Sequence, residues 1–114
     1  MAVVSVEIGG ADSLPADPLT AAQAFHADVL PRLLAQPGGA GALTLLLPPL
    51  PYQQTGWLLA ALQSLARARA PQRINAVAGA EPARGSIAQW LEGAEAITGQ
   101  LIHADGGSAA GVVS

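Results

Sequence analysis

The order of apolar and polar positions along the chain predicts an alternation of strands and helices. Four short apolar runs have strand length, at residues 2–8, 42–47, 73–78 and 100–104. Each meets a glycine or a proline at one of its ends, as strands commonly do. The second run is continuously apolar, so we expect a strand that is buried on both faces of its sheet.

Between the first two strands, residues 19–36 carry apolar side chains at helical spacing. Asp17 or Thr20 is expected to cap this helix, with Pro18 in its first turn. Pro31 lies inside the pattern and should kink the helix or loosen one turn, because proline lacks an N–H and its ring clashes with the preceding turn. The sequence therefore predicts an interrupted helix.

A second helix is predicted over 53–70, where the apolar surface is much wider than one stripe. A helix of this kind is buried on more than one side. A shorter helix is expected from Ser86, as its cap, to about Glu92. The tail 108–114 consists of small residues and is expected to be loosely held.

Strands separated by helical segments form parallel sheets, because the helices cross over the sheet between neighbouring strands. We therefore expect a single domain over residues 1–114, of the α/β class, with a mainly parallel sheet of about four strands.

The composition favours a globular protein that lacks the features of a nucleic-acid or membrane protein. The chain is 51% hydrophobic and only 11% charged, with a net charge of −3. So few charges leave apolar surface that a partner is expected to cover. The negative balance argues against nucleic-acid binding, and no apolar run has the length of a membrane span. No signal peptide is recognised, so a cytoplasmic location is expected.

The polar residues that could take part in catalysis or metal binding have no suitable partner residues near them in the sequence. Tyr52 could be a displaced acid, but no cation lies within four residues of it, and a half-buried loop tyrosine is expected. His26 and His103 have no carboxylate or second histidine at metal-ligand spacing, so no metal site is expected. The segment 48–51, Pro-Pro-Leu-Pro, resembles a polyproline ligand, but next to a buried strand we interpret it as a rigid terminator of that strand.

Four segments in chain order resemble the C-terminal half of the short-chain dehydrogenase/reductases, NAD(P)-dependent oxidoreductases with a Rossmann-type sheet. Val29–Leu33 resembles the family's long helix, and Ala60–Arg67 the segment just after its catalytic lysine. Arg73–Ala78 resembles its sixth strand, and Thr98–Gly107 its last strand and turn. The resemblance implies a Rossmann-like three-layer sandwich equivalent to that half, with the strand 2–8 in place of the family's fourth strand.

The positions that carry the family's chemistry hold other residues here. The family uses a tyrosine acid, a lysine four residues later, a serine and an asparagine. The resemblance places Thr55 at the tyrosine position and Leu59 at the lysine position. Pro48 or Pro49 falls at the serine position, and the asparagine position falls near Pro18. A phenol with a pKa of about 10 needs a nearby cation to act near neutral pH, and the chain contains no lysine.

The family's glycine-rich turn, which binds the cofactor pyrophosphate, has no counterpart. Such a site needs a strand, a glycine turn and a helix N-terminus aimed at the phosphates. The glycines at 9–10 run into a proline-broken loop, and those at 38–41 precede a strand, so both are interpreted as turns. We therefore expect no cofactor and no catalysis of hydride transfer.

The helix 53–70 and the long helix before it correspond to the family's main dimer interface, a four-helix bundle across a two-fold axis. The wide apolar surface and the small residues of helix 53–70 favour close approach of a second copy. We therefore expect a homodimer. The residues expected in its interface are Phe25, Val29, Trp57, Leu58, Ala61, Leu62 and Leu65.

The strand 2–8 offers a second surface, because without the family's first three strands it lacks its usual neighbour. Glu7 is its only charge, and an edge strand of this kind pairs readily with another chain. A dehydrogenase of the same family is one partner that it could bind.

These observations lead to a non-catalytic, dimeric pseudoenzyme that acts as an interaction or regulatory module. Two alternatives remain open. One is an NAD(P)-dependent oxidoreductase subunit completed by a partner chain. The other is a small-ligand binding protein that uses the cleft beyond the carboxyl ends of the strands.

Overall fold

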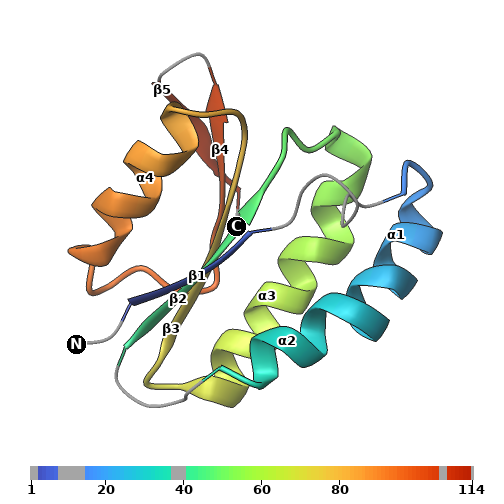
Figure 1. Ribbon diagram of the computed structural model, residues 1–114, viewed down its shortest axis with the longest axis horizontal. Helices are drawn as coiled ribbons and strands as arrows, with labels where there is room; N and C mark the ends of the chain where they lie inside the picture. Colours follow the sequence, from blue (N-terminus) through green and yellow to red (C-terminus); the bar gives the residue numbers. More distant parts are fainter. Residues whose placement is uncertain (1–2, 8–14, 37–40, 106–107, 114) are drawn as a thin grey trace.

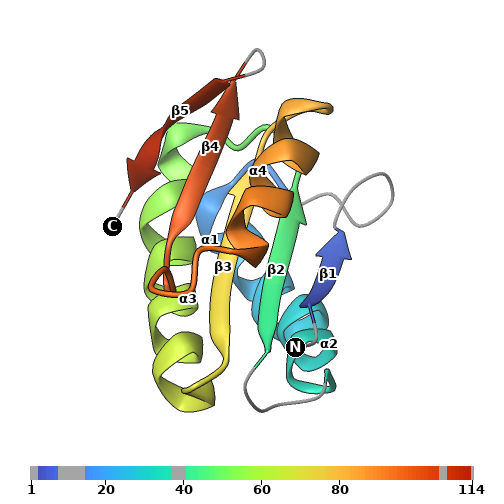
Figure 2. The same cartoon turned by 90° about the vertical axis from the view of Figure 1, so that its left-hand side faces the viewer.

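The computed structural model describes residues 3–7, 15–36, 41–105 and 108–113, which form a five-stranded sheet with helices on both faces (Figures 1 and 2). In chain order the elements are β1 (Val3–Glu7), α1 (Pro18–Ala24), the π-helical turn η2 (Phe25–Val29), α2 (Leu30–Leu34), β2 (Ala42–Leu47), the 3₁₀ turn η3 (Tyr52–Gln54), α3 (Thr55–Arg69), β3 (Arg73–Ala78), α4 (Ala83–Glu92), β4 (Leu101–Asp105) and β5 (Ser108–Val113).

The first four strands are parallel and follow one another across the sheet in chain order. All four predicted strands are present, with ends within one residue of those expected. Ala42 of β2 pairs with Val3 on one side and with Arg73 on the other, and Ala78 of β3 pairs with His103 of β4. The α/β class and the mainly parallel sheet are therefore confirmed, and β1 lies at one edge.

The sheet has one strand more than predicted. Residues 108–113, expected to be a loosely held tail, form β5, which runs antiparallel to β4. Val112 and Val113 pair with Ile102 and Leu101, and β-branched residues such as valine are common in strands. The small residues before these valines masked the strand signal.

The molecule has three layers (Figures 1 and 2). The segments α1, η2, α2 and α3 lie on one face of the sheet, and α4 lies on the other. On the first face, alternate residues of β2 and β3 pack against the helices in the larger core; its largest fully buried side chains are Phe25, Leu33, Leu43, Leu45, Leu47, Leu58, Leu62, Ile74 and Leu101. A smaller cluster under α4 contains Val77, Leu91 and Ile102.

The predicted defect in the first helix is a π-helical turn. α1 ends at Ala24, residues 25–29 follow a wider turn, and α2 resumes at Leu30. The N–H of Leu30 bonds to the carbonyl of Phe25, five residues back, in place of the usual four. Pro31 has no N–H for an α-helical bond and its ring crowds the carbonyl four residues earlier, so the wider turn accommodates it.

The prediction for the start of α4 is wrong. Ser86 is not the cap but an interior residue, since its N–H bonds to the carbonyl of Pro82, and the helix begins at Ala83. The side chain of Glu81 takes the role instead: its Oε1 accepts a 2.7 Å hydrogen bond from the N–H of Gly85. A carboxylate before a helix start satisfies N–H groups that lack a partner within the helix.

Candidate functional site

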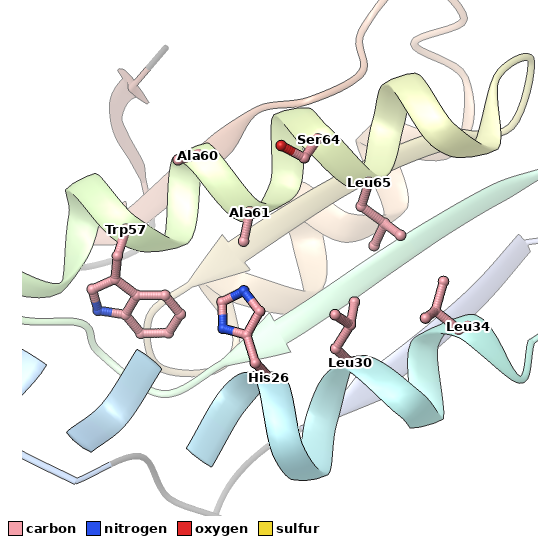
Figure 3. Close-up of a pocket in the computed structure, with 8 residues that line it drawn as sticks. All are labelled: His26, Leu30, Leu34, Trp57, Ala60, Ala61, Ser64 and Leu65. Carbon is pink, nitrogen blue, oxygen red and sulfur yellow. The ribbon is translucent and has the colours of Figure 1, made fainter. Parts of the chain in front are cut away.

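A groove runs between α3 and the first helical segment, by which we mean α1, η2 and α2 together, on one face of the molecule (Figure 3). We call it the interhelical groove. It has a volume of about 500 Å³. Its walls are mainly apolar, and the residues that line it are His26, Leu30, Leu34, Trp57, Ala60, Ala61, Ser64 and Leu65.

Trp57 is held in place at one end of this groove. Its ring lies 5.3 Å from that of Phe25, centroid to centroid and edge to face, and 6.4 Å from the ring of His26. Its Nε1 donates a 2.7 Å hydrogen bond to Oε1 of Gln54. The imidazole Nδ1 of His26 lies 2.7 Å from the carbonyl oxygen of Ala22. The aromatic end of the groove is therefore preorganised.

The structure corrects the premise behind the predicted dimer interface. Phe25, Val29, Leu58, Leu62 and Leu65 are between 0 and 6% exposed and belong to the core of the single chain. The wide apolar surface of α3 is covered by the sheet and by the first helical segment, and it does not need a second copy for this. Five of the seven predicted residues thus contribute packing within the chain.

Trp57 and Ala61 differ from those five residues because both are only partly buried, and together with Leu65 they line the interhelical groove. Beside them lie His26 and Leu34, which the sequence analysis did not place at an interface. Leu34 is 50% exposed. An amphipathic pattern marks such a leucine as apolar but does not separate it from the buried Leu33 next to it.

A second hollow lies at the carboxyl edge of the parallel strands, and we call it the carboxyl-end cavity. It has a volume of about 700 Å³. Its lining comes from three parts of the chain: the start of α3, the preceding turn and β4. The residues are Leu50, Tyr52, Gln53, Thr55, Gly56, Leu59 and His103.

Three of the four positions that the resemblance aligns with the family's catalytic residues lie at this edge. Thr55 and Leu59, at the tyrosine and lysine positions, both line the carboxyl-end cavity. Pro48, at the serine position, lines a neighbouring hollow together with Leu50. Pro18 is the first residue of α1, behind the cap Asp17. The side chains at these four positions supply one hydroxyl and otherwise hydrocarbon.

Tyr52 is not half-buried, as was expected, but 81% exposed, because it stands on the outer side of the short turn η3. The structure nevertheless brings it to the same cavity as His103. His103 lies in the strand β4, and the register that pairs it with Ala78 at the end of β3 carries it to the carboxyl edge. No pattern in the sequence joins these two residues.

The described residues do not fit a dinucleotide in the way the family holds one. No lysine or arginine lines the carboxyl-end cavity, where a ribose-binding cation would lie. The glycines at 9–10 and 38–40 lie outside the described residues. Among the described residues, no group of three or more histidine or acidic side chains is arranged to hold a metal ion. In the same part of the chain, no helix has the length and apolarity needed to cross a bilayer.

The comparison with protein families agrees with the geometry. The sequence model of a family described as short chain dehydrogenase-like protein (SDR-like) matches residues 10–104. This match covers most of the chain, which therefore belongs to the SDR-like family. No curated protein and no solved structure gives a significant match.

Proposed function

We propose that this member of the SDR-like family is a non-catalytic protein that forms homodimers and acts as an interaction module. The observation that carries the proposal is the composition of the carboxyl-end cavity, which is lined by Leu59 and Thr55. The resemblance aligns these two residues with the family's lysine and tyrosine. An aliphatic alcohol without a neighbouring cation is a poor proton donor to a developing alkoxide. The scaffold is retained while the acid–base pair is absent.

The interhelical groove supports self-association. Leu34 is half exposed, and the partly buried Leu30 and Trp57 extend the apolar surface along the groove. Ala60 and Ala61 are small enough to let a helix of a second copy approach closely. Because Gln54 and Phe25 already fix Trp57, docking against its ring costs little further side-chain entropy.

A charge placed in the groove tests the dimer. We expect the wild-type chain to sediment at twice the mass of one chain, and Ala60→Glu to raise the dimer dissociation constant by about tenfold or more, because the carboxylate would be buried without a partner. Ala68→Glu is the matched control, since Ala68 is exposed on the same helix and does not line the groove. A wild-type monomer at high concentration would defeat the proposal.

Titration with NADH and NADPH tests the catalytic part separately. We expect no change in cofactor fluorescence at millimolar concentrations, since the described residues provide no cation for the ribose at the carboxyl-end cavity. Saturable binding of either cofactor at micromolar concentration would favour the alternative of an oxidoreductase subunit that a partner chain completes.

The edge strand β1 supports a second kind of partner. Within the described residues β1 pairs only with β2, and a free strand edge presents N–H and C=O groups to another strand. A dehydrogenase of the same family, adding its own strand at this edge, is the partner we propose. A pull-down in which no family member is enriched over a mock bait would argue against it.

A further inference from the structure

The carboxyl-end cavity has features of a binding site that the dimer does not use. It shares no lining residue with the interhelical groove. Its volume of about 700 Å³ falls within the range of roughly 300–1,000 Å³ typical of small-molecule sites. The strand ends that border it are also where open α/β sheets bind ligands. The cavity therefore needs its own explanation.

The lining combines hydrocarbon with uncharged polar groups. Leu50 and Leu59 are partly buried and pack against the larger core, so they form an apolar wall. Tyr52 and Thr55 offer hydroxyl groups, and His103 offers an imidazole. Within the described part of the chain, these three polar side chains form no hydrogen bond with another side chain or with the backbone. Their hydrogen-bonding capacity is thus open to a ligand.

Among the described residues, the lining contains no acidic side chain, lysine or arginine, and this limits the class of ligand. A phosphate or sulfonate placed against Leu50 and Leu59 would lose hydration without gaining a countercharge, which is unfavourable. A neutral molecule with an apolar body loses little hydration there. Because the ring of Tyr52 is 81% exposed beside the cavity, it offers a face against which a flat aromatic ligand can stack.

We propose that the carboxyl-end cavity binds an uncharged aromatic molecule that carries a hydroxyl group. The ring lies between Tyr52 and the leucine wall, and the hydroxyl group hydrogen-bonds to both Thr55 and His103. This inference does not depend on the homodimer, because the groove and the cavity lie on different residues.

Fluorescence titration of the full chain with 2-naphthol tests the ligand class. Two probes of the same ring system serve as comparisons: 2-methylnaphthalene lacks the hydroxyl group, and 2-naphthalenesulfonate carries a charge. We expect saturable binding of 2-naphthol that is about three- to tenfold tighter than that of 2-methylnaphthalene, as one or two hydrogen bonds would give. We expect the sulfonate to bind most weakly.

Substitutions locate the binding. Thr55→Val and His103→Phe each remove a hydrogen-bonding group. We expect either substitution to weaken the binding of 2-naphthol but not that of 2-methylnaphthalene. Leu59→Phe fills part of the cavity and should weaken the binding of both 2-naphthol and 2-methylnaphthalene. Gln89→Ala is the control, because Gln89 is exposed on α4 and lines none of these hollows. A folded Leu59→Phe or Thr55→Val protein that binds 2-naphthol as the wild type does would overturn the proposal, as would equal affinity for all three probes.

The proposal of a homodimer and the proposal of a ligand site can be tested separately. Ala60→Glu should dissociate the dimer and leave the affinity for 2-naphthol unchanged, since Ala60 lines only the groove. In ¹H–¹⁵N spectra, 2-naphthol should shift the amide signals of Thr55, Gly56 and His103 and leave those of Leu30 and Leu34 unmoved. Shifts confined to the groove residues would show that the probe binds there, against the proposal.

Discussion

The indole nitrogen of Trp57 donates a 2.7 Å hydrogen bond to the side-chain oxygen of Gln54, and this bond joins the interhelical groove to the core. Gln54 is only 2% exposed. Its amide nitrogen donates to the carbonyl oxygens of Pro15, at 3.1 Å, and Ala16, at 3.0 Å. One buried amide therefore fixes the aromatic wall of the groove and also holds the chain that leads into α1.

Removal of this amide should weaken the fold. We expect Gln54→Met to lower the free energy of unfolding by about 2 kcal/mol, because two carbonyl groups and the Trp57 N–H lose their partners while the volume is kept. Urea unfolding followed by circular dichroism measures the change. Gln53→Met is the control, since Gln53 is exposed. Equal stability losses in the two variants would show that these bonds contribute little.

The buried guanidinium of Arg73 should matter in the same way for α4. Its Nη1 donates to the carbonyl oxygens of Leu91 and Ala94, and its Nη2 to that of Glu92, so it satisfies the C-terminal end of the helix. We expect Arg73→Met to lower the free energy of unfolding by about 2–4 kcal/mol and to speed amide exchange in α4 selectively.

The comparison for this prediction is Arg67→Met. Arg67 is exposed and its Nη2 donates only a 3.4 Å bond to Ser64, so its replacement should change stability by less than about 0.5 kcal/mol. If amide exchange in α4 of Arg73→Met matched the wild type, the capping role of Arg73 would be refuted.

The apolar pattern predicted the sheet well because the strands β2 and β3 are buried along nearly all of their length. Continuous burial leaves a continuous apolar run in the sequence, and prolines and glycines mark its ends. β5 was missed for the opposite reason, since its small residues carry little strand preference. Ser86 was wrongly predicted as the cap because serine is a common cap residue. The longer side chain of Glu81 reaches the N–H of Gly85 instead.

The sites were harder to predict, because an apolar residue that packs in the core of its own chain and one that packs against a partner look the same in the sequence. Leu58 and Trp57 are neighbours on one helix, yet Leu58 is fully buried in the core and Trp57 lines the groove. The carboxyl-end cavity depends on the sheet register that brings His103 near Thr55. Such a register is a property of the folded chain and cannot be read from residue spacing.

The cap of α1 makes stability depend on pH in a predictable direction. Two hydrogen bonds from Thr20, one from its N–H at 2.9 Å and one from its hydroxyl at 2.8 Å, hold the pKa of Asp17 below its usual value of 3.8. A lowered folded-state pKa stabilises the fold above the unfolded-state value, and this contribution is lost as pH falls through the folded-state pKa.

Asp17→Asn removes the negative charge but keeps the capping hydrogen bonds, because asparagine also accepts hydrogen bonds at this position. We expect the difference in unfolding free energy between wild type and Asp17→Asn to shrink as pH falls from 6 to about 3. Asp17→Ala, which loses the cap altogether, should remain less stable than Asp17→Asn over the whole range. A wild-type advantage over Asp17→Asn that grows toward acid pH would contradict this assignment.

Two glycines with opposite surroundings provide the last prediction. Gly79 follows β3 with φ of +152°, and a Cβ atom there would lie 2.8 Å from the Cβ of Ala104 and closer still to its carbonyl oxygen. Gly56 lies in the first turn of α3, and a Cβ atom there would meet nothing within 4 Å. Alanine should therefore act in opposite directions at the two positions.

We expect Gly79→Ala to lower the free energy of unfolding by roughly 2 kcal/mol or more, because the backbone conformation and the contact with β4 are both unfavourable for a side chain. Gly56→Ala should raise it by about 0.5–1 kcal/mol, since alanine restricts the unfolded chain and fits a helix. Thermal and urea unfolding of the two variants measure both changes. Because Ala104 belongs to β4, a tolerated Gly79→Ala would mean that β4 can move away from the end of β3, and the geometry of the carboxyl-end cavity would then be less rigid than its sheet register implies.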